Sequence, residues 1–426
     1  MGLFQLTMYG TGLILGAGIY VLIGEAAGFA GDAVWIAFVL GSIVALFAGF
    51  SYAELSSIFP KASAEYVFIK NAFKNNFFAF LIGWLTAITS VITAATVALG
   101  FGGYFAEFVN IPIILSATGL LIVLSIVNFI GIRESAWTNT IFTIIEVSGL
   151  VLIIVIGFMF ANPEPVNYIE SPSGFSGIVI AFVLIFFAFI GFEDMANIAE
   201  EVKKPRKTLP RAIILSVVIS GIIYILVSLA VVRVVNWEEL AKSSAPIALV
   251  AERALGSEAH ILLSSIALFA ITNTVLITLV AGSRIFYGMA REKVFPTILE
   301  KIHFKTKTPW IAIVVIMIAS IIFTLVGDIV IVANITVFAI VITFAAVNLA
   351  VIVLRYTEPN IERKFKVPIN VEKFPILPLF GVGISIYMAF QFEIEVVLVG
   401  ISIIGIGAAF YSISKKFNKS RVGNVK

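Results

Sequence analysis

Long runs of apolar residues dominate this sequence and limit what it can fold into. An α-helix needs about 20 apolar residues to cross a bilayer, and 60% of the 426 residues are hydrophobic whereas 12% are charged. Soluble domains are roughly half apolar and a quarter charged. We therefore expect an all-α polytopic membrane protein, because a helix satisfies the backbone polar groups of such a run within itself.

Twelve such runs can be read along the chain, which predicts twelve transmembrane helices. They lie near residues 4–28, 33–56, 77–106, 112–131, 138–161, 175–199, 209–232, 259–290, 309–326, 329–354, 376–392 and 394–413. The breaks between them contain residues that favour turns. These are Gly31 with Asp32, Pro112, Pro163, Pro165, Pro210, Pro309, Gly327 with Asp328, and Pro375.

The loop charges predict the orientation of these helices. Of the 28 lysines and arginines, 24 fall in the even-numbered loops and the C-terminal tail, whereas the odd-numbered loops hold Arg233, Lys242 and Arg253. Positive charge is retained on the cytoplasmic side of a membrane. We therefore expect a multi-pass protein of the cell membrane with both termini in the cytoplasm.

The scarcity of reactive side chains excludes several classes of chemistry. The chain has no cysteine, and its two histidines, His260 and His303, lie outside the middle of any apolar run. No GxxxxGK[ST] phosphate-binding loop is present, so direct ATP drive is not supported. We expect no enzyme activity, no cofactor, no metal site and no nucleic-acid partner.

Two of the apolar runs are interrupted at corresponding places. The first contains GTGLILGAGIY (10–20), and the sixth, FVLIFFAFIGFEDMANIAEEV (182–202), turns polar at Gly191. Interrupted spans at matching positions of two halves indicate the central site of a transporter. For the first run alone, glycines that permit close helix packing are an alternative explanation.

Broken helices expose backbone groups that a ligand can use. Free amides around Gly16, Ala17 and Gly18 would begin a half-helix and suit a carboxylate. Free carbonyls around Phe187, Ala188 and Ile190 would end one and suit an ammonium group. Together these groups match the part that all α-amino acids share.

Five motifs carry a resemblance that extends over essentially the whole chain. They are LGAGIYVLIGEAAG (15–28), YAELSSIFPKASAEY (52–66), GIRESAWTNTIFT (131–143), GFEDMANIAEEVKKPRKTLPRAI (191–213) and SRIFYGMAREKVFP (283–296). In them the sequence resembles the amino acid–polyamine–organocation (APC) superfamily, closest to its cationic amino acid transporter-like branch.

The resemblance implies a LeuT-like 5+5 inverted repeat with two accessory helices, and secondary transport of amino acids by alternating access. The repeats would be residues 1–161 and 162–354, with accessory helices and a tail at 355–426. It also implies that Gly16, Ala17 and Gly18 bind the substrate carboxylate. Phe187 would close over the substrate as a gate, and Glu193 would help to arrange a gate.

The sequence departs from the family pattern at three positions. Thr89 stands on span 3 where cationic transporters have a glutamate, which favours a neutral substrate because a buried cation would lack a partner. Glu146 stands on span 5 where some proton-coupled relatives have a lysine that replaces a sodium ion. Ser63 stands where the family usually has glycine, which puts the local turn in doubt.

Glu146 lies about eight residues into span 5, or roughly 12 Å deep. A carboxylate at that depth costs on the order of 3 kcal/mol and usually has a role. It can carry the coupling proton, tie span 5 to span 8, or bind sodium with the help of Thr272. The sequence leaves these three alternatives open.

Other polar residues have both a structural and a functional interpretation. Thr86, Thr89, Thr93 and Thr96 share one face of span 3 and can line a substrate path or bond only their own backbone. Glu54, near a span end, is expected to form a structural pair.

The sequence as a whole favours proton-coupled uptake of a neutral amino acid. The alternatives are an exchanger, a cationic amino acid or polyamine carrier and, from a different class, a transporter-like sensor or a channel. The expected partners are the amino acid, a proton or sodium ion, and the lipid bilayer.

Overall fold

The structure is a computed structural model that describes residues 1–61, 63–106, 108–130, 135–160, 166–326 and 328–423. Side chains are described except at 135–139 and 413–423. Within this part the chain is almost wholly helical, and its one small sheet pairs β1 (Asn370–Val371) with β2 (Phe374–Pro375) in antiparallel register. The predicted proline breaks at Pro163 and Pro165, the glycine of the Gly327–Asp328 break, and part of the 131–143 motif lie outside the described residues.

Helices follow the apolar runs along the chain. Those in the first half are α1 (Leu3–Leu15), α2 (Ala17–Ala30), η1 (Gly31–Ala33), α3 (Val34–Ile58), α4 (Ala64–Phe73), α5 (Asn76–Ala106), α6 (Ile113–Ile130), α7 (Ser135–Met159), α8 (Gly174–Ile185), η2 (Phe186–Phe189), α9 (Asp194–Asn197) and η3 (Ala199–Glu201). Those in the second half are α10 (Pro205–Val234), α11 (Trp237–Leu240), α12 (Pro246–Leu255), α13 (Ser257–Arg291), η4 (Thr297–Glu300), α14 (Trp310–Thr324), α15 (Ile329–Thr357), α16 (Ile376–Ala389) and α17 (Ile394–Gly423).

Nine helical segments of the described chain are long and apolar enough to cross a membrane, which confirms the prediction of a polytopic membrane protein. One of them, Leu3–Ile58, contains α1, α2 and α3 in succession. Two further apolar helices, α14 and α16, are shorter. Large apolar side chains are exposed along α6 and α14, as expected of surfaces that face lipid.

Local chemistry explains two of the helix boundaries. Gly31 ends α2 with φ +61°, a left-handed conformation that favours glycine. Asp328 begins α15 by accepting hydrogen bonds from the amides of Val330 (2.9 Å) and Ile331 (3.1 Å). The prediction that Pro210 marks a break was wrong, because α10 begins at Pro205 and Pro210 lies inside the helix.

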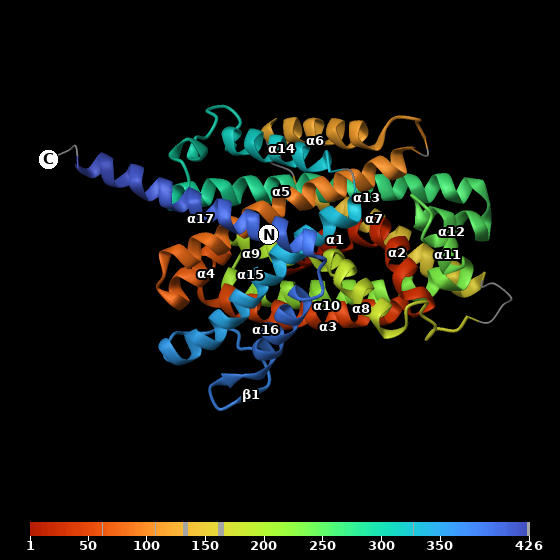
Figure 1. Ribbon diagram of the computed structural model, residues 1–426, viewed down its shortest axis with the longest axis horizontal. Coiled ribbons are helices and arrows are strands. Elements are labelled where there is room, and N and C mark those ends of the chain that lie inside the picture. Colours follow the sequence, from red (N-terminus) through yellow and green to blue (C-terminus); the bar gives the residue numbers. More distant parts are fainter. Residues whose placement is uncertain (62, 107, 131–134, 161–165, 327, 424–426) are drawn as a thin grey trace.

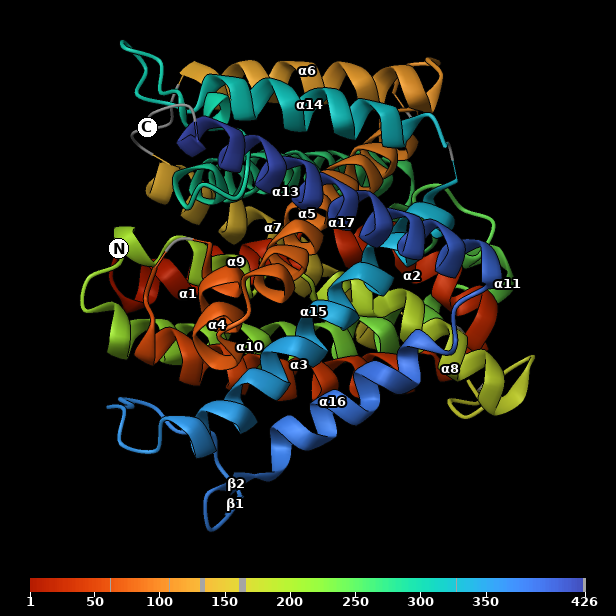
Figure 2. The same cartoon turned by 60° about the vertical axis from the view of Figure 1, so that its left-hand side comes forward.

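The helices form a bundle in which α5 and α13 pack together through the middle (Figure 1). Beside this pair, α10 packs against both α1 and α3. Helices α6 and α14 lie side by side along one edge of the bundle, whereas α16 lies toward the opposite edge (Figure 1; Figure 2). The interrupted segments α1–α2 and α8–α9 therefore lie among other helices.

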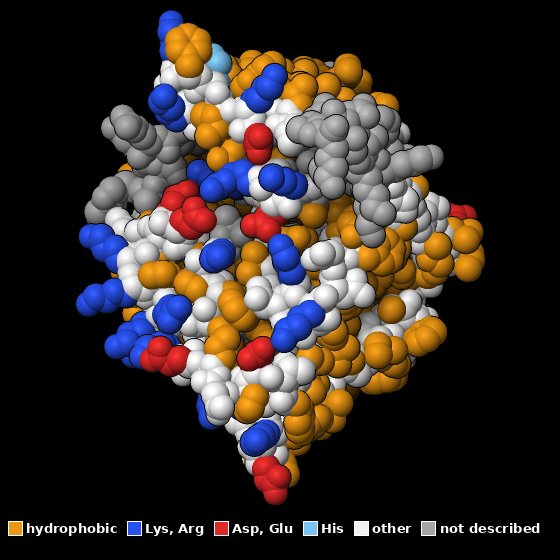
Figure 3. Space-filling model, turned by 90° about the vertical axis from the view of Figure 1, so that its left-hand side faces the viewer, with side chains coloured by type: hydrophobic (Ala, Val, Ile, Leu, Met, Phe, Trp, Pro, Cys, Tyr) orange, Lys and Arg blue, Asp and Glu red, His pale blue; other side chains and the backbone are white. Residues whose placement is uncertain are grey.

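Charged side chains gather at the end of the bundle that Figure 3 shows. There the N-terminal ammonium of Met1 donates to the carbonyl of Glu201 (2.6 Å), and the Lys203 amide donates to the carbonyl of Met1 (2.9 Å). The charged end thus brings the beginning of the chain next to the segment that follows the broken sixth span.

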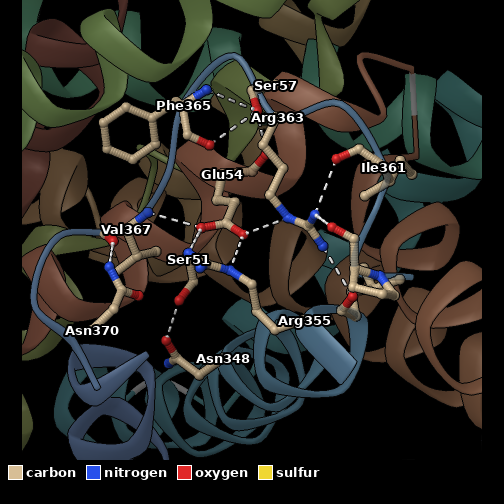
Figure 4. Close-up of polar contacts among 12 residues, drawn as sticks. Ser51, Glu54, Ser57, Asn348, Arg355, Ile361, Arg363, Phe365, Val367 and Asn370 are labelled. Atoms are coloured by element: carbon tan, nitrogen blue, oxygen red, sulfur yellow. Dashed lines mark hydrogen bonds and ion pairs between the residues drawn. The ribbon is translucent and has the colours of Figure 1, made fainter. Parts of the chain in front are cut away.

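A buried ion cluster ties three segments together near this end (Figure 4). The Glu54 carboxylate, at the end of α3, accepts from Arg355 Nε (2.7 Å) and from another guanidinium nitrogen of Arg355 (2.6 Å). It also accepts from Arg363 Nε (3.1 Å) and from the Val367 amide (2.8 Å). The expected structural pairing of Glu54 is confirmed.

Candidate functional site

The first span is interrupted at a single residue. Helix α1 ends at Leu15, α2 begins at Ala17, and Gly16 between them has φ −41° and ψ −108°. The first amides of α2 therefore have no carbonyl partner within their own helix. A Cβ atom on Gly16 would overlap the hydroxyl of Thr274 on α13, so any larger residue there would have to displace the Thr274 side chain.

The sixth span is interrupted over a longer stretch. After η2, Ile190 is extended (φ −66°, ψ 139°) and Gly191 has φ +127°, a conformation that side chains other than glycine rarely adopt. The Gly191 amide donates to Glu193 Oε2 (2.9 Å), so the side chain of Glu193 closes the turn before α9 begins. Both predicted interruptions are present.

The two interruptions touch each other. A Cβ atom on Gly18 would overlap the backbone of Ala188, and one on Gly191 would lie 3.0 Å from Leu13 Cβ. The Tyr224 hydroxyl on α10 contacts the carbonyls of both Ile14 and Ala188, the latter at 2.9 Å. One side chain thus bridges the carbonyl groups of both broken spans.

Two of the three carbonyls expected to hold an ammonium group already have partners. The Phe187 carbonyl accepts from the Ile190 amide (3.1 Å), and the Ala188 carbonyl accepts from Tyr224. Each carbonyl oxygen has a second lone pair, so both can still accept a further donor. The side chain of Phe187 is buried and does not line the cavity described next.

A small cavity of about 20 Å³ lies beside the interruptions. Its walls include Leu13, Ile190 and Ile340, together with four hydroxyl-bearing residues of α5, which are Thr86, Thr89, Ser90 and Thr93. This volume holds about one water molecule, so an amino acid can enter only if the surrounding helices move apart.

The hydroxyl face of span 3 fits both of its interpretations. Thr86, Thr89 and Thr96 donate to the carbonyls four residues earlier in their own helix. Thr86 and Thr89 nevertheless line the cavity, whereas Thr96 does not. On α13 the cavity is lined by Thr274 and Thr278, while Thr272 is only partly buried and lies outside it.

A family model described as "Amino acid permease" matches residues 1–412. This chain belongs to the amino acid permease family.

Curated relatives of the permease span nearly its whole length. It is 31% identical over 413 residues to the branched-chain amino acid permease BcaP of Bacillus subtilis, covering 91% of this chain and 87% of that protein. It is 30% identical over 416 residues to the methylthioribose transporter of the same organism, with the same coverage. Identity to the mouse cationic amino acid transporter 4 is 30% over 380 residues, which is 84% of this chain and 60% of that protein.

In the permease, Glu146 lies at the depth of the first interruption. Two neighbours on its helix fix the register, because Thr143 packs against Gly12 and Gly149 packs against Tyr20. Glu146 lies between these two contacts, and therefore beside the segment from Gly12 to Tyr20 that contains the interruption at Gly16. The Tyr20 hydroxyl donates to its backbone carbonyl (3.1 Å).

The carboxyl group of Glu146 has no hydrogen-bond partner within the described part of the chain. It is 0% exposed, and neither oxygen has a hydrogen bond among the described residues. Among the described residues, no hydrogen bond of this side chain ties span 5 to span 8, which is one of the alternatives that the sequence left open. A charged carboxylate in such a place is unfavourable unless a proton or a cation neutralises it.

A second polar cluster closes the charged end beneath the cavity. Asn197 Oδ1 accepts from the Ala64 amide (2.8 Å), and its Nδ2 donates to Glu65 Oε2 (3.2 Å). The Tyr52 hydroxyl also donates to Glu65 (3.1 Å). Burial raises the pKa of Glu65 to about 6. We call Tyr52, Ala64, Glu65 and Asn197 the inner latch.

The turn that precedes the latch keeps its shape without glycine. Ser63 has φ +54°, the left-handed conformation that explains why glycine is usual there. Gly288 makes room for it, because a Cβ atom on Gly288 would overlap the Ser63 hydroxyl.

Sequence reasoning missed the role of Tyr224. A single tyrosine in an apolar run gives a weak signal, because its hydroxyl needs a partner wherever the residue is buried. Its two carbonyl partners, from Ile14 and Ala188, belong to other helices and are identified only by the fold.

Proposed function

We propose that this permease is a secondary active transporter that takes up an α-amino acid together with a proton by alternating access. The observation that carries the proposal is the meeting of two broken spans, with Gly18 against Ala188 and Leu13 against Gly191. Beside them lies the Glu146 carboxyl group, which has no hydrogen-bond partner among the described residues. The substrate carboxylate would bind the free amides of α2, in keeping with the positive end of a helix dipole.

We further propose twelve spans in a 5+5 inverted repeat, with boundaries at 161 and 354 and accessory helices in 355–426. Reciprocal packing supports it. The contact of α1 in the first repeat with α10 in the second corresponds to that of α8 in the second repeat with α3 in the first. Within the repeats, the contact of α5 with α6 corresponds to that of α13 with α14. Splitting Leu3–Ile58 at Gly31 and adding the two short helices brings nine segments to twelve.

The orientation in this proposal places the charged end, with both termini, in the cytoplasm of the cell. The inner latch then lies on the cytoplasmic side of the cavity. For the cavity to open toward the cytoplasm, Asn197 must separate from Glu65 and Ala64. The small size of the cavity corresponds to a conformation that is open to neither side of the membrane.

Coupling through Glu146 is energetically sufficient. A 100-fold accumulation costs about 2.7 kcal/mol, and one charge crossing 100 mV provides about 2.3 kcal/mol. One proton that crosses the membrane down this potential and a modest pH gradient therefore supplies enough free energy for the accumulation. The alternative is sodium binding at Glu146. The helping hydroxyl would then be that of Thr274 on α13, which lies beside Gly16, rather than that of Thr272.

Two observations favour different side chains in the substrate. Thr89 provides no carboxylate on span 3, which favours a neutral amino acid, and BcaP is named a branched-chain permease. Across the same cavity, however, lie Glu193 and Asp194, which favour a cationic side chain, and another relative is named a cationic amino acid transporter.

The proposal is tested by uptake of radiolabelled amino acids into proteoliposomes with an imposed pH gradient. We expect uptake by the parent protein and its loss in Gly18→Val, because the added side chain separates the two interruptions. Gly119→Val is the matched control, since open space surrounds that glycine on α6, and it should retain uptake. Uptake that follows internal amino acid and ignores the pH gradient would instead establish an exchanger.

A further inference from the structure

One carboxylate in the cavity takes no part in the proton coupling proposed above. The carboxylate of Glu193 already accepts a hydrogen bond from the Gly191 amide. Asp194 lines the same cavity and is 8% exposed, so more than nine-tenths of it is buried. Its backbone amide donates to the Gly191 carbonyl (3.1 Å), but its carboxylate has no hydrogen bond or ion pair within the described part of the chain.

An unused hydroxyl lies in the wall of the same cavity. Thr93 on α5 is 9% exposed, and its Oγ1 has no hydrogen-bond partner among the described residues. No lysine, arginine or histidine of the described chain lines the cavity. Arg284, further along α13, already pairs with Glu201 (3.3 Å). The cavity thus has unfilled acceptors and an excess of negative groups, which suits a cationic ligand.

The depth of Asp194 indicates which part of a ligand it can reach. Gly191 packs against Leu13, three residues or about 4.5 Å along the helix from Gly16. Asp194 follows Gly191 by a further turn of chain. The α-ammonium group of an amino acid is attached to the same carbon as the carboxylate, so a molecule held at Gly16–Gly18 reaches Asp194 only with the end of a long side chain.

We propose that Asp194, assisted by the hydroxyl of Thr93, binds the distal ammonium or guanidinium group of a basic amino acid. This inference rests on the proposed function, since it assumes that the α-carboxylate is held at the start of α2. The carboxylate missing at Thr89 on span 3 is then supplied by the broken sixth span. A diamine presents the same distal cation without the α-carboxylate.

The test compares lysine with norleucine, which has the same carbon chain without the distal ammonium group. Calorimetric titration of the full-length permease in lipid nanodiscs should give lysine binding at least about tenfold tighter than norleucine binding. In Asp194→Asn this ratio should fall to about one while norleucine binding is retained. Asp194→Glu should restore part of the preference, and Glu201→Gln, an acid-to-amide change outside the cavity, should leave it intact.

Several outcomes would overturn the inference. They are equal binding of lysine and norleucine by the parent protein, or an unchanged lysine preference in Asp194→Asn. A variant that keeps its selectivity but loses pH dependence of norleucine uptake would make Asp194 a proton carrier instead. Binding of norleucine alone defeats only this inference, whereas binding of no amino acid defeats the proposed function as well.

Cadaverine, the diamine that lacks the carboxylate of lysine, separates the two ligand sources. Weaker binding of cadaverine than of lysine supports the amino acid. Equal binding that depends on Asp194 supports the cation subsite and overturns the role of the α2 amides.

Discussion

Glu54 and Glu146 are both buried glutamates, 1% and 0% exposed, yet their surroundings differ completely. The Glu54 carboxylate accepts four hydrogen bonds, three of them from Arg355 and Arg363 (Figure 4). Neither oxygen of Glu146 accepts any from the described residues. A fully partnered buried charge belongs to the architecture, whereas an unpartnered one requires something that the chain does not supply.

The largest expected effect is on stability when Glu54 is changed. Glu54→Gln leaves two buried guanidinium groups without their counter-charge, which costs about 3–5 kcal/mol. We expect a large fall in the melting temperature of the detergent-solubilised protein. Glu362→Gln is the control, because that carboxylate is exposed and pairs with Lys364 at the surface. Equal melting temperatures for the two variants would contradict the structural role of the cluster.

The next effect is on transport and should come without loss of stability. Glu146→Gln places a neutral amide where the protonated acid would lie, so the protein should melt no lower than the parent. A gradient of two pH units, which sustains about 100-fold accumulation per proton, should sustain none in the variant. The measurement is the pH profile of proteoliposome uptake, and an unchanged profile would remove Glu146 from coupling.

The smallest effect concerns Glu65. Its carboxylate is intermediate between those of Glu54 and Glu146, because it accepts hydrogen bonds from neutral groups but pairs with no cation among the described residues. It faces Tyr52, Asn197, Glu193 and Asp194, and its pKa rises from 4.5 to about 6 through burial. The native protein therefore binds more protons than the unfolded chain between these values. Stability should fall by up to about 2 kcal/mol as the pH rises from 4.5 to 6.

Unfolding at several pH values measures this contribution. Glu65→Gln should lose the decline across that window. Glu292→Gln, an exposed partner of Lys70 next to the latch, should keep it. A decline that persists in Glu65→Gln would assign the titration to another group.

The sequence by itself determined those features of the protein that depend only on residues close together in the chain. Length and hydropathy located the apolar helices, glycine spacing located the interruption at Gly16, and the abrupt polarity after Ile190 located the one at Gly191. The place of Glu146 inside its apolar run followed from counting residues along the chain. These features were predictable because bilayer thickness, helix rise and backbone conformation act over short stretches of chain.

Tertiary structure decided which polar groups find partners. Glu54 meets Arg355 from 301 residues away. Tyr224 donates to the Ala188 carbonyl, which was expected to be free, and Thr274 rather than Thr272 lies beside Gly16. Asp194 reaches the cavity while Phe187 does not. The rotation of each helix and the packing of distant segments set these contacts, and a local pattern of hydropathy contains no information about either.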